Sequence, residues 1–435
     1  SDSVLNGIDQ AVKDDMDVIN LSLGANINDP LYPTSIAINN ATLAGVVCDV
    51  AAGNSGPGQA TVGSPGTSAL AITVGASTIP ESIATMTIKN GSVSYKARLF
   101  GKDFSQSDDA YKGQTLPIVD VGLGSEADYS GIDVKGKLVL VKRGVDYLST
   151  KMTNAHKAGA AGMIIWDNTD DSDSQGYIPS FLGVSMDNIY SVSLTQAQGQ
   201  ALSDAIKKDP KTASITFPST LDTPIIKNGD ELASFSSTGP VKDWTIKPDV
   251  VAPGVDISST APYDIWESQA NGTHDYKLAY QIESGTSMAT PHAAGISALI
   301  KAAHPDYTPA DVKAVLMNTA KSIDTDSKKY SVYQVGAGRV NPARAIATDV
   351  KIQVLDKTYA ADSDNTLTEV ENLTGSMFFG FKGRGEGATN GSDDVVSSKD
   401  FNVSNQGNSS KTFKVSTEFI STKFARSNNV GPGTG

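Results

Sequence analysis

The sequence predicts an α/β fold in which a parallel sheet is interrupted by an inserted β-rich domain and followed by the start of a C-terminal β-sandwich. Helical and strand-like segments alternate over the first 78 residues, and mostly apolar strands between helices are typical of parallel sheets. From about residue 80 the pattern changes, because threonine, serine and lysine now alternate with apolar residues. The α/β pattern returns after about residue 228, so one domain is inserted into another.

Composition restricts the class of protein. The chain has 435 residues, 39% of them hydrophobic, and its 40 glycines follow no period, which excludes disorder, collagen and coiled coil. Lysine and arginine number 35 against 48 acidic residues, and the net charge of −13 disfavours nucleic acid and anionic lipid as partners. No stretch reaches the apolar length of a membrane span. We therefore expect a folded chain of about two to three domains.

The opening 78 residues predict two helices and three strands. Apolar residues at helical spacing predict helices over residues 3–15 and 36–43. Short apolar runs bounded by glycine predict buried strands over residues 17–23, 46–52 and 69–74. The single cysteine, Cys48, lies in the second of these strands, where we interpret it as a small buried hydrophobic residue.

The predicted insertion has elements of its own. An apolar run flanked by lysines predicts a strand over residues 137–142. Residues 148–158 predict a helix, and the small and apolar residues of 160–166 predict a second strand. This pattern ends near Pro224.

The second α/β part predicts two helices. One begins near Ser287 and ends at about His304, and a face of small residues implies close packing against a sheet: Ala289, Ala293, Ala294, Gly295 and Ala298. The other begins after Thr308, an N-cap followed by proline, and extends to about Ala320. Beyond Lys351 the chain is rich in serine, threonine, asparagine and glycine, and alternating strands such as Lys411 to Val415 predict the start of a β-sandwich.

Two polar residues are candidates for catalysis. Ser287 lies at a glycine-preceded turn that leads into a helix, where free N–H groups and the positive end of the helix dipole can stabilise an oxyanion. Asn54 ends a buried strand, and its amide can donate to the same oxyanion. Taken singly, the serine is more simply a helix cap and the asparagine a turn former. The catalytic interpretation requires both groups to converge on one atom-sized position.

Four motifs together resemble the subtilisin-like serine proteases. They are GTSMATPHAAG at residues 285–295, AAGNSG at 51–56, DVINLSLG at 17–24 and KPDVVAPG at 247–254. They occur in the family's order over roughly residues 1–78 and 228–346. The resemblance implies a three-layer peptidase domain with a parallel sheet, and the hydrolysis of peptide bonds in proteins through an acyl-enzyme.

The same resemblance assigns roles to residues of this chain. Ser287 matches the nucleophile, and Asn54 matches the side chain of the oxyanion hole. The resemblance implies that further residues line the substrate cleft, where a peptide binds as an added strand: Ser22, Leu23, Gly24, Ala52 and Gly53.

The inserted part resembles a protease-associated domain, on GKLVLVKRG at residues 136–144 and NAHKAGAAG at 154–162. With the β-sandwich that follows, the chain is similar to large bacterial subtilases of the lactocepin or minor extracellular protease type. The resemblance implies an extracellular or cell-surface location, a monomer and bound calcium, although no calcium ligand set can be matched. The implied boundaries are 1–78 and 228–347 for the peptidase domain, 79–227 for the insertion, and 348–435 for an incomplete fibronectin-type-III-like sandwich.

One departure from the family pattern concerns the base that must activate the serine. The family's aspartate and histidine motifs do not occur before Asn54, so we expect a fragment that is inactive alone. The chain's four histidines offer weak substitutes. His292 points away from Ser287 around the helix, His304 lies at the helix end, His156 belongs to the insertion, and His274 lies beside Asp275 in a polar loop.

Two other functions were weighed. A non-catalytic cell-surface binding module derived from a protease remains an alternative, and the presence or absence of an upstream aspartate and histidine separates it from the protease. An α/β-hydrolase esterase fits poorly, because its nucleophile turn requires glycine where this chain has Ala289, and its base follows the serine.

Overall fold

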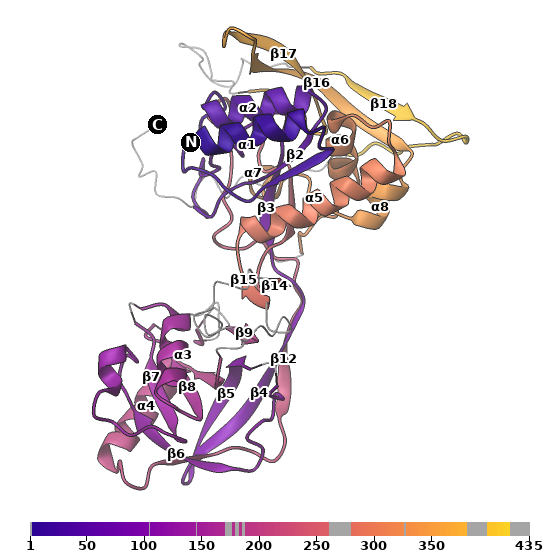
Figure 1. The fold of residues 1–435 in the computed structure, drawn as a ribbon. Coiled ribbons are helices and arrows are strands. Elements are labelled where there is room, and N and C mark those ends of the chain that lie inside the picture. Colours follow the sequence, from indigo (N-terminus) through magenta and orange to yellow (C-terminus); the bar gives the residue numbers. More distant parts are fainter. Residues whose placement is uncertain are drawn as a thin grey trace, which may run out of the picture. The chain divides into compact units, whose positions relative to one another are not determined.

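The computed structural model describes residues 2–103, 105–144, 146–169, 176–178, 182–184, 188–260, 280–325, 328–380 and 398–417. His274 and Asp275 lie outside these residues. The chain divides into two compact units (Figure 1). The first comprises Ser1–Ile79, Gly229–Ile257 and Glu283–Gly435, and the second comprises Pro80–Asn228 and Ser258–Ile282.

The first unit is built on a parallel four-stranded sheet. Its strands lie in the order β1-β2-β3-β13, and every neighbouring pair is parallel. They are β1 (Val18–Leu21), β2 (Val47–Ala51), β3 (Ile72–Ser77) and β13 (Val250–Pro253). The predicted parallel sheet is therefore confirmed.

Helices cover both faces of this sheet. On β2, Cys48 and Val50 join a core cluster with α1 (Asp2–Lys13) and α2 (Pro33–Leu43), whereas Val47 joins a cluster with α5 (Thr286–Ala303) and α6 (Pro309–Thr319). The alternation follows from the two-residue period of a strand. Cys48 is 1% exposed, as predicted for a small hydrophobic residue. Two short helices, α7 (Val332–Val335) and α8 (Pro342–Ala347), follow.

Helix α5 presents a different face to the sheet from the one predicted. Ala289, Ala293 and Ala294 are buried as expected, but Gly295 and Ala298 are exposed to solvent. The buried positions recur every three or four residues, and these two residues fall on the opposite side of the helix. The larger Ile296 and Ile300 complete the packed face.

The third strand begins three residues later than predicted. Residues 69–71 are apolar, but two of their carbonyl groups bond to lysine side chains: Ala69 O accepts from Lys313 Nζ, and Ala71 O accepts from Lys247 Nζ. Those carbonyls are therefore occupied before the sheet pairing starts at Ile72.

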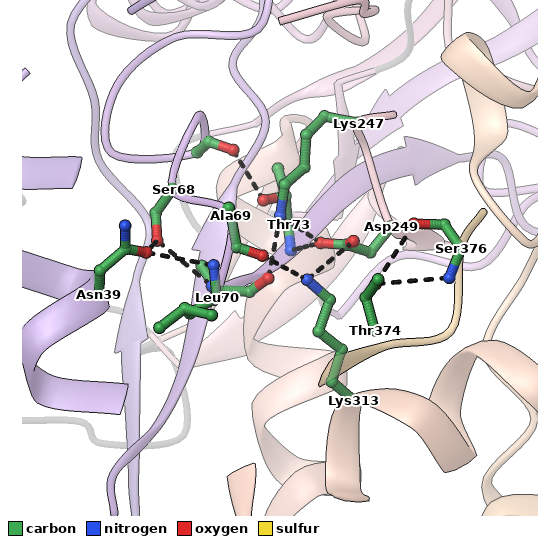
Figure 2. A network of polar contacts seen from close by, with 12 residues as sticks. Asn39, Ser68, Ala69, Leu70, Thr73, Lys247, Asp249, Lys313, Thr374 and Ser376 are labelled. Atoms are coloured by element: carbon green, nitrogen blue, oxygen red, sulfur yellow. Dashed lines mark hydrogen bonds and ion pairs between the residues drawn. The ribbon is translucent and has the colours of Figure 1, made fainter. Parts of the chain in front are cut away.

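The two lysines belong to a buried charged cluster beside the sheet, defined as Lys247, Asp249 and Lys313 (Figure 2). Lys247 Nζ lies 2.6 Å from Asp249 Oδ2, and Lys313 Nζ lies 3.2 Å from Asp249 Oδ1. The Thr73 N–H also donates to Asp249 Oδ2 at 2.7 Å. Burial raises the pKa of Asp249, but the two lysines outweigh it and hold the pKa below its ordinary value.

The second unit contains a mixed nine-stranded sheet. Seven strands pair in a closed ring, because β4 pairs with β5 as well as with β11. In the order of the ring these strands are β4 (Glu81–Asn90), β11 (Ser214–Thr216), β6 (Thr115–Asp120), β7 (Leu138–Lys142), β8 (Gly162–Trp166), β10 (Tyr190–Leu194) and β5 (Val93–Lys102). The remaining elements are β9 (Gly183–Val184), β12 (Asp222–Lys227), α3 (Leu148–Lys157), α4 (Gln196–Lys208) and the 3₁₀ helix Glu126–Tyr129. Strands β14 (Ile257–Thr260) and β15 (Tyr280–Glu283) pair with each other.

The C-terminal part of the first unit has a single antiparallel sheet in the order β17-β16-β18. Its strands are β16 (Val350–Ala361), β17 (Leu367–Thr374) and β18 (Phe401–Asn405). Asn39 and Asn40 of α2 bond to the backbone of Tyr359 and Ala361, which attaches this sheet to the peptidase-like part. The predicted strand 411–415 is wrong. Val415 is 80% exposed, and the segment pairs with no strand in the described part of the chain.

Across the residues that the structure describes, no helix combines the length and apolar character needed to cross a membrane.

Candidate active site

Ser287 lies in the first turn of α5, directly after the cap residue Gly285 and Thr286. The backbone of Gly285 is extended, so its conformation alone does not require glycine. The close approach of another side chain does: a Cβ atom on Gly285 would lie 3.2 Å from Asn54 Nδ2. Glycine thus allows the Asn54 amide to lie against the turn that carries Ser287.

Asn54 follows the end of β2. The chain leaves the strand at Gly53, whose φ of +106° lies in the region that favours glycine. Asn54 Oδ1 accepts two hydrogen bonds of 2.9 Å each, from the N–H and the hydroxyl of Thr286. These two donors fix the amide so that Oδ1 faces the helix. Asn54 Nδ2 has no hydrogen-bond partner among the described residues.

The N-terminus of α5 leaves a second donor free. The N–H groups of Met288 and Ala289 bond to the Gly285 carbonyl, and that of Thr286 bonds to Asn54. The N–H of Ser287 has no partner within the described part of the chain. It lies at the positive end of an 18-residue helix, where a negative charge is stabilised.

Two hydrogen bonds join Ser287 to the loop after β1. Ser287 Oγ donates to the Ser22 carbonyl at 3.3 Å. Ser22 Oγ donates to the Ser287 carbonyl at 2.7 Å. The first is a long hydrogen bond, so it holds the candidate nucleophile weakly.

These groups meet in a cleft of about 280 Å³. Six of the seven residues singled out from the sequence line it: Leu23, Gly24, Ala52, Gly53, Asn54 and Ser287. The seventh, Ser22, contacts Ser287 as described above. The structure therefore brings all seven together, and the serine and the asparagine face the same cleft.

Sequence reasoning missed the other residues that line the cleft, namely Ala25, Asn26, Ala51, Ser55, Gly63 and Thr286. All but Gly63 directly adjoin or lie within two residues of a predicted site residue, so extending each motif along the chain would have found them. Gly63 has no such signal. A Cβ atom there would lie 2.3 Å from the Ala25 carbonyl, a contact that only the fold creates.

The described histidines have partners away from Ser287. The exposed His292 bonds through Nδ1 to the Met288 carbonyl at 2.8 Å, one turn back along its own helix. His304 bonds through Nε2 to the Ile346 carbonyl and stacks on Tyr307. His156 lies on α3 in the second unit. Within the described residues, no imidazole bonds to Ser287 Oγ.

The described residues form no group of three histidine, cysteine, aspartate or glutamate side chains that could hold a metal ion.

Comparison with known proteins identifies the family to which the chain belongs. The model of the subtilase family matches residues 1–357. The minor extracellular protease Vpr of Bacillus subtilis (strain 168) is 37% identical over 379 residues, covering 86% of this chain and 44% of that protein. The subtilisin-like protease SBT1.4 of Arabidopsis thaliana is 33% identical over 387 residues, covering 82% of this chain and 47% of that protein.

Among solved structures, the psychrophilic subtilisin-like protease Apa1 of the Antarctic psychrotroph Pseudoalteromonas sp. AS-11 matches with 20% identity and a TM-score of 0.34. The match covers 79% of this chain and 72% of that chain. The chain spans less than half the length of the two curated relatives named above.

Proposed function

The chain belongs to the subtilase family, and on that premise we propose that it carries the nucleophile and oxyanion hole of a serine endopeptidase that cleaves protein substrates. One observation carries the proposal. Two hydrogen-bond donors without partners among the described residues, Asn54 Nδ2 and the Ser287 N–H, lie in one cleft beside the Ser287 hydroxyl. The two hydrogen bonds to Asn54 Oδ1 turn its amide nitrogen away from the helix backbone, and the Ser287 N–H lies at the positive end of α5, so both donors are available to an oxyanion that enters the cleft.

The chemistry follows from these positions. Ser287 Oγ adds to the carbonyl carbon of the substrate while a base takes its proton, and the carbonyl electron pair moves to the oxygen. Asn54 Nδ2 and the Ser287 N–H then donate to that oxyanion. When the electron pair returns, the C–N bond breaks and the amine leaves with the proton. Water hydrolyses the resulting ester of Ser287 and restores the hydroxyl.

In this proposal the base and its orienting carboxylate come from polypeptide outside this chain, and the chain is inactive alone. The contacts of His292 and His304 support this, because both rings are held by backbone carbonyls at positions other than Ser287. The long bond from Ser287 Oγ to the Ser22 carbonyl also supports it, since a weakly held hydroxyl can redirect its hydrogen bond to an incoming imidazole, which then takes the proton.

The substrate binds in extended form between two segments of the cleft. Leu23 and Gly24 from one segment and Ala52 and Gly53 from another line the cleft, and Ser22 adjoins the first, so we expect a peptide strand to pair with the backbone of these segments. The described lining residues carry no charged side chain. An uncharged substrate side chain therefore fits this cleft without leaving a charge unpaired.

The remaining parts of the chain are assigned by the same proposal. Residues 79–227 form a protease-associated domain that controls substrate access, supported by the separate compact unit and its closed ring of strands. Residues 1–78 and 228–347 form the peptidase domain, and residues 348–435 begin a fibronectin-type-III-like sandwich, supported by the antiparallel β16–β18 sheet. The protein is an extracellular or cell-surface bacterial monomer; the extracellular location is supported by its similarity to the minor extracellular protease Vpr of Bacillus subtilis.

The test is covalent labelling of Ser287. The chain is complemented with the N-terminal part of a full-length relative, treated with a fluorophosphonate and analysed by mass spectrometry. We expect labelling at Ser287 in the complemented protein, none in the chain alone, and none after Ser287→Ala. An unlabelled Ser287 in the complemented protein would show that the proposal is wrong.

A further inference from the structure

The first turn of α5 contains a backbone carbonyl that lacks its usual helical partner. In a regular α-helix, the carbonyl of residue i accepts from the N–H of residue i+4. For Ser287 that residue is Pro291, which lies inside the helix and has no N–H. The carbonyl of the candidate nucleophile therefore needs a donor from outside the helix.

Ser22 supplies that donor. Its hydroxyl donates to the Ser287 carbonyl at 2.7 Å, between residues 265 positions apart in the chain. The contact is partly buried, which limits competition from water. It is shorter than the 3.3 Å bond that runs in the opposite sense, from Ser287 Oγ to the Ser22 carbonyl.

Asn20 fixes the direction of the Ser22 hydroxyl. Asn20 Nδ2 donates to Ser22 Oγ at 3.1 Å, which occupies one acceptor position on that oxygen. The Ser22 proton is then free to point at the Ser287 carbonyl. Two hydrogen bonds that run in the same sense polarise each other, so each strengthens the other. The end of β1 is thereby tied to the start of α5.

We propose that Ser22 is a positioning residue for Ser287: its hydroxyl donates the hydrogen bond that Pro291, which has no N–H, cannot give to the Ser287 carbonyl. This bond holds the Ser287 N–H and hydroxyl against the Asn54 amide. Ser22 then positions the nucleophile in addition to its expected role in lining the substrate cleft. Its effect on catalysis rests on the proposed function. Misplacing reacting groups by about 1 Å can cost about a hundredfold in rate, so a single fixed carbonyl matters to the chemistry.

A double-mutant cycle tests the proposal in the complemented protein. Ser22→Ala removes the donor, and Pro291→Ala restores the helical N–H that makes the donor unnecessary. We expect Ser22→Ala to slow fluorophosphonate labelling about tenfold when Pro291 is present. In the Pro291→Ala background the same change costs less than about twofold, because the carbonyl now has its helical partner. Ser22→Thr keeps a hydroxyl and retains the rate.

Steady-state kinetics on a peptide substrate separates positioning from substrate binding. A positioning role lowers kcat with little change in KM, whereas a residue that only lines the cleft raises KM when it is truncated. Ser94→Ala, at an exposed serine of β5, is the matched control and should change neither constant. Equal losses from Ser22→Ala in both backgrounds, or an effect confined to KM, would overturn the proposal.

The same double-mutant cycle can be measured on the melting temperature of the 435-residue chain, which requires no enzymatic activity. Ser22→Ala should lower the melting temperature more with Pro291 than with alanine at that position, and additive shifts would overturn the hydrogen-bond assignment. Failure of the proposed function has a different signature, because the unsubstituted complemented protein would then carry no label on Ser287.

Discussion

Two polar regions of the first unit differ in how completely their hydrogen-bonding groups are paired. In the buried charged cluster, Asp249 accepts hydrogen bonds from Lys247 and the Thr73 N–H and forms an ion pair with Lys313. Each lysine also donates to a backbone carbonyl. In the cleft, Asn54 Nδ2 and the Ser287 N–H have no partners among the described residues.

The difference shows which polar groups serve the fold and which are available to a ligand. Burying a charge without a partner costs several kcal/mol, so the cluster must be fully paired to exist at all. Donors at the surface can remain unpaired, because water satisfies them until a ligand replaces it. The sheet connects the two regions: β2 leads to Asn54, and β3 carries the Thr73 that bonds to the cluster.

Breaking the cluster should have the largest effect on stability. Asp249→Ala leaves two lysines buried without their carboxylate, and we expect it to lower the free energy of unfolding by about 3 to 5 kcal/mol. Urea denaturation followed by circular dichroism measures the loss. Glu231→Ala is the control, because its exposed pair with Lys328 should contribute about 1 kcal/mol or less. Equal losses from the two substitutions would contradict the assigned role of the buried cluster.

Removing a cleft donor should reduce activity far more than stability, although Asn54→Ala also removes the acceptor of the two Thr286 hydrogen bonds, at a cost of about 1 to 3 kcal/mol. Asn54→Ala deletes the Nδ2 donor from an exposed residue, and we expect fluorophosphonate labelling of Ser287 in the complemented protein to slow by about a hundredfold or more. The rate of labelling and the urea midpoint are measured on the same sample. Asn6→Ala, at an exposed residue of α1, should alter neither. An Asn54→Ala variant that labels at the normal rate would remove Asn54 from the oxyanion hole.

The sequence predicted the elements around the cleft well because their signals are local. The helix start at Thr308 is such a case, since its side chain accepts from the Asp311 N–H three residues later, as the capping pattern requires. The motif around Ser287 likewise consists of residues that are adjacent in the sequence, so a local pattern is enough to recognise it. For the same reason, six of the seven predicted site residues could be placed on the cleft lining from short motifs alone.

The errors have long-range causes. Residues 69–71 were expected in a strand, but their carbonyls bond to lysines some 176 and 244 positions away, which no local pattern reveals. The hydrogen bond from Ser22 Oγ to the Ser287 carbonyl likewise joins residues far apart in the sequence, so no local pattern reveals it. Residues 411–415 alternate as a strand should, yet a strand also needs a partner, and the described part of the chain provides none.

A third substitution sharpens the comparison at Asp49, a carboxylate in the core with one oxygen that is unpaired among the described residues. Asp49 of β2 is completely buried, accepts from Ser297 of α5 at 3.3 Å through Oδ1, and has no partner for Oδ2 among the described residues. Burial raises the pKa of Asp49 to about 8, and the nearby charge of Asp249 raises it further while the Ser297 bond opposes the shift. The native state therefore keeps a proton that the unfolded chain releases above its ordinary pKa of 3.8.

The sign of the pH dependence follows from this difference. Between pH 3.8 and about 8 the native state binds one proton more than the unfolded state, so stability falls as the pH rises. The slope for one proton is about 1.4 kcal/mol per pH unit. Asp49→Asn keeps an acceptor for Ser297 and cannot ionise, so the curve of unfolding free energy against pH should flatten by about this slope across neutral pH. Asp14→Asn, at an exposed residue directly after α1, should leave the curve unchanged. Parallel curves for the unsubstituted chain and Asp49→Asn would mean that Asp49 is ionised in the core, and that its free oxygen has a partner such as the lysines of the cluster.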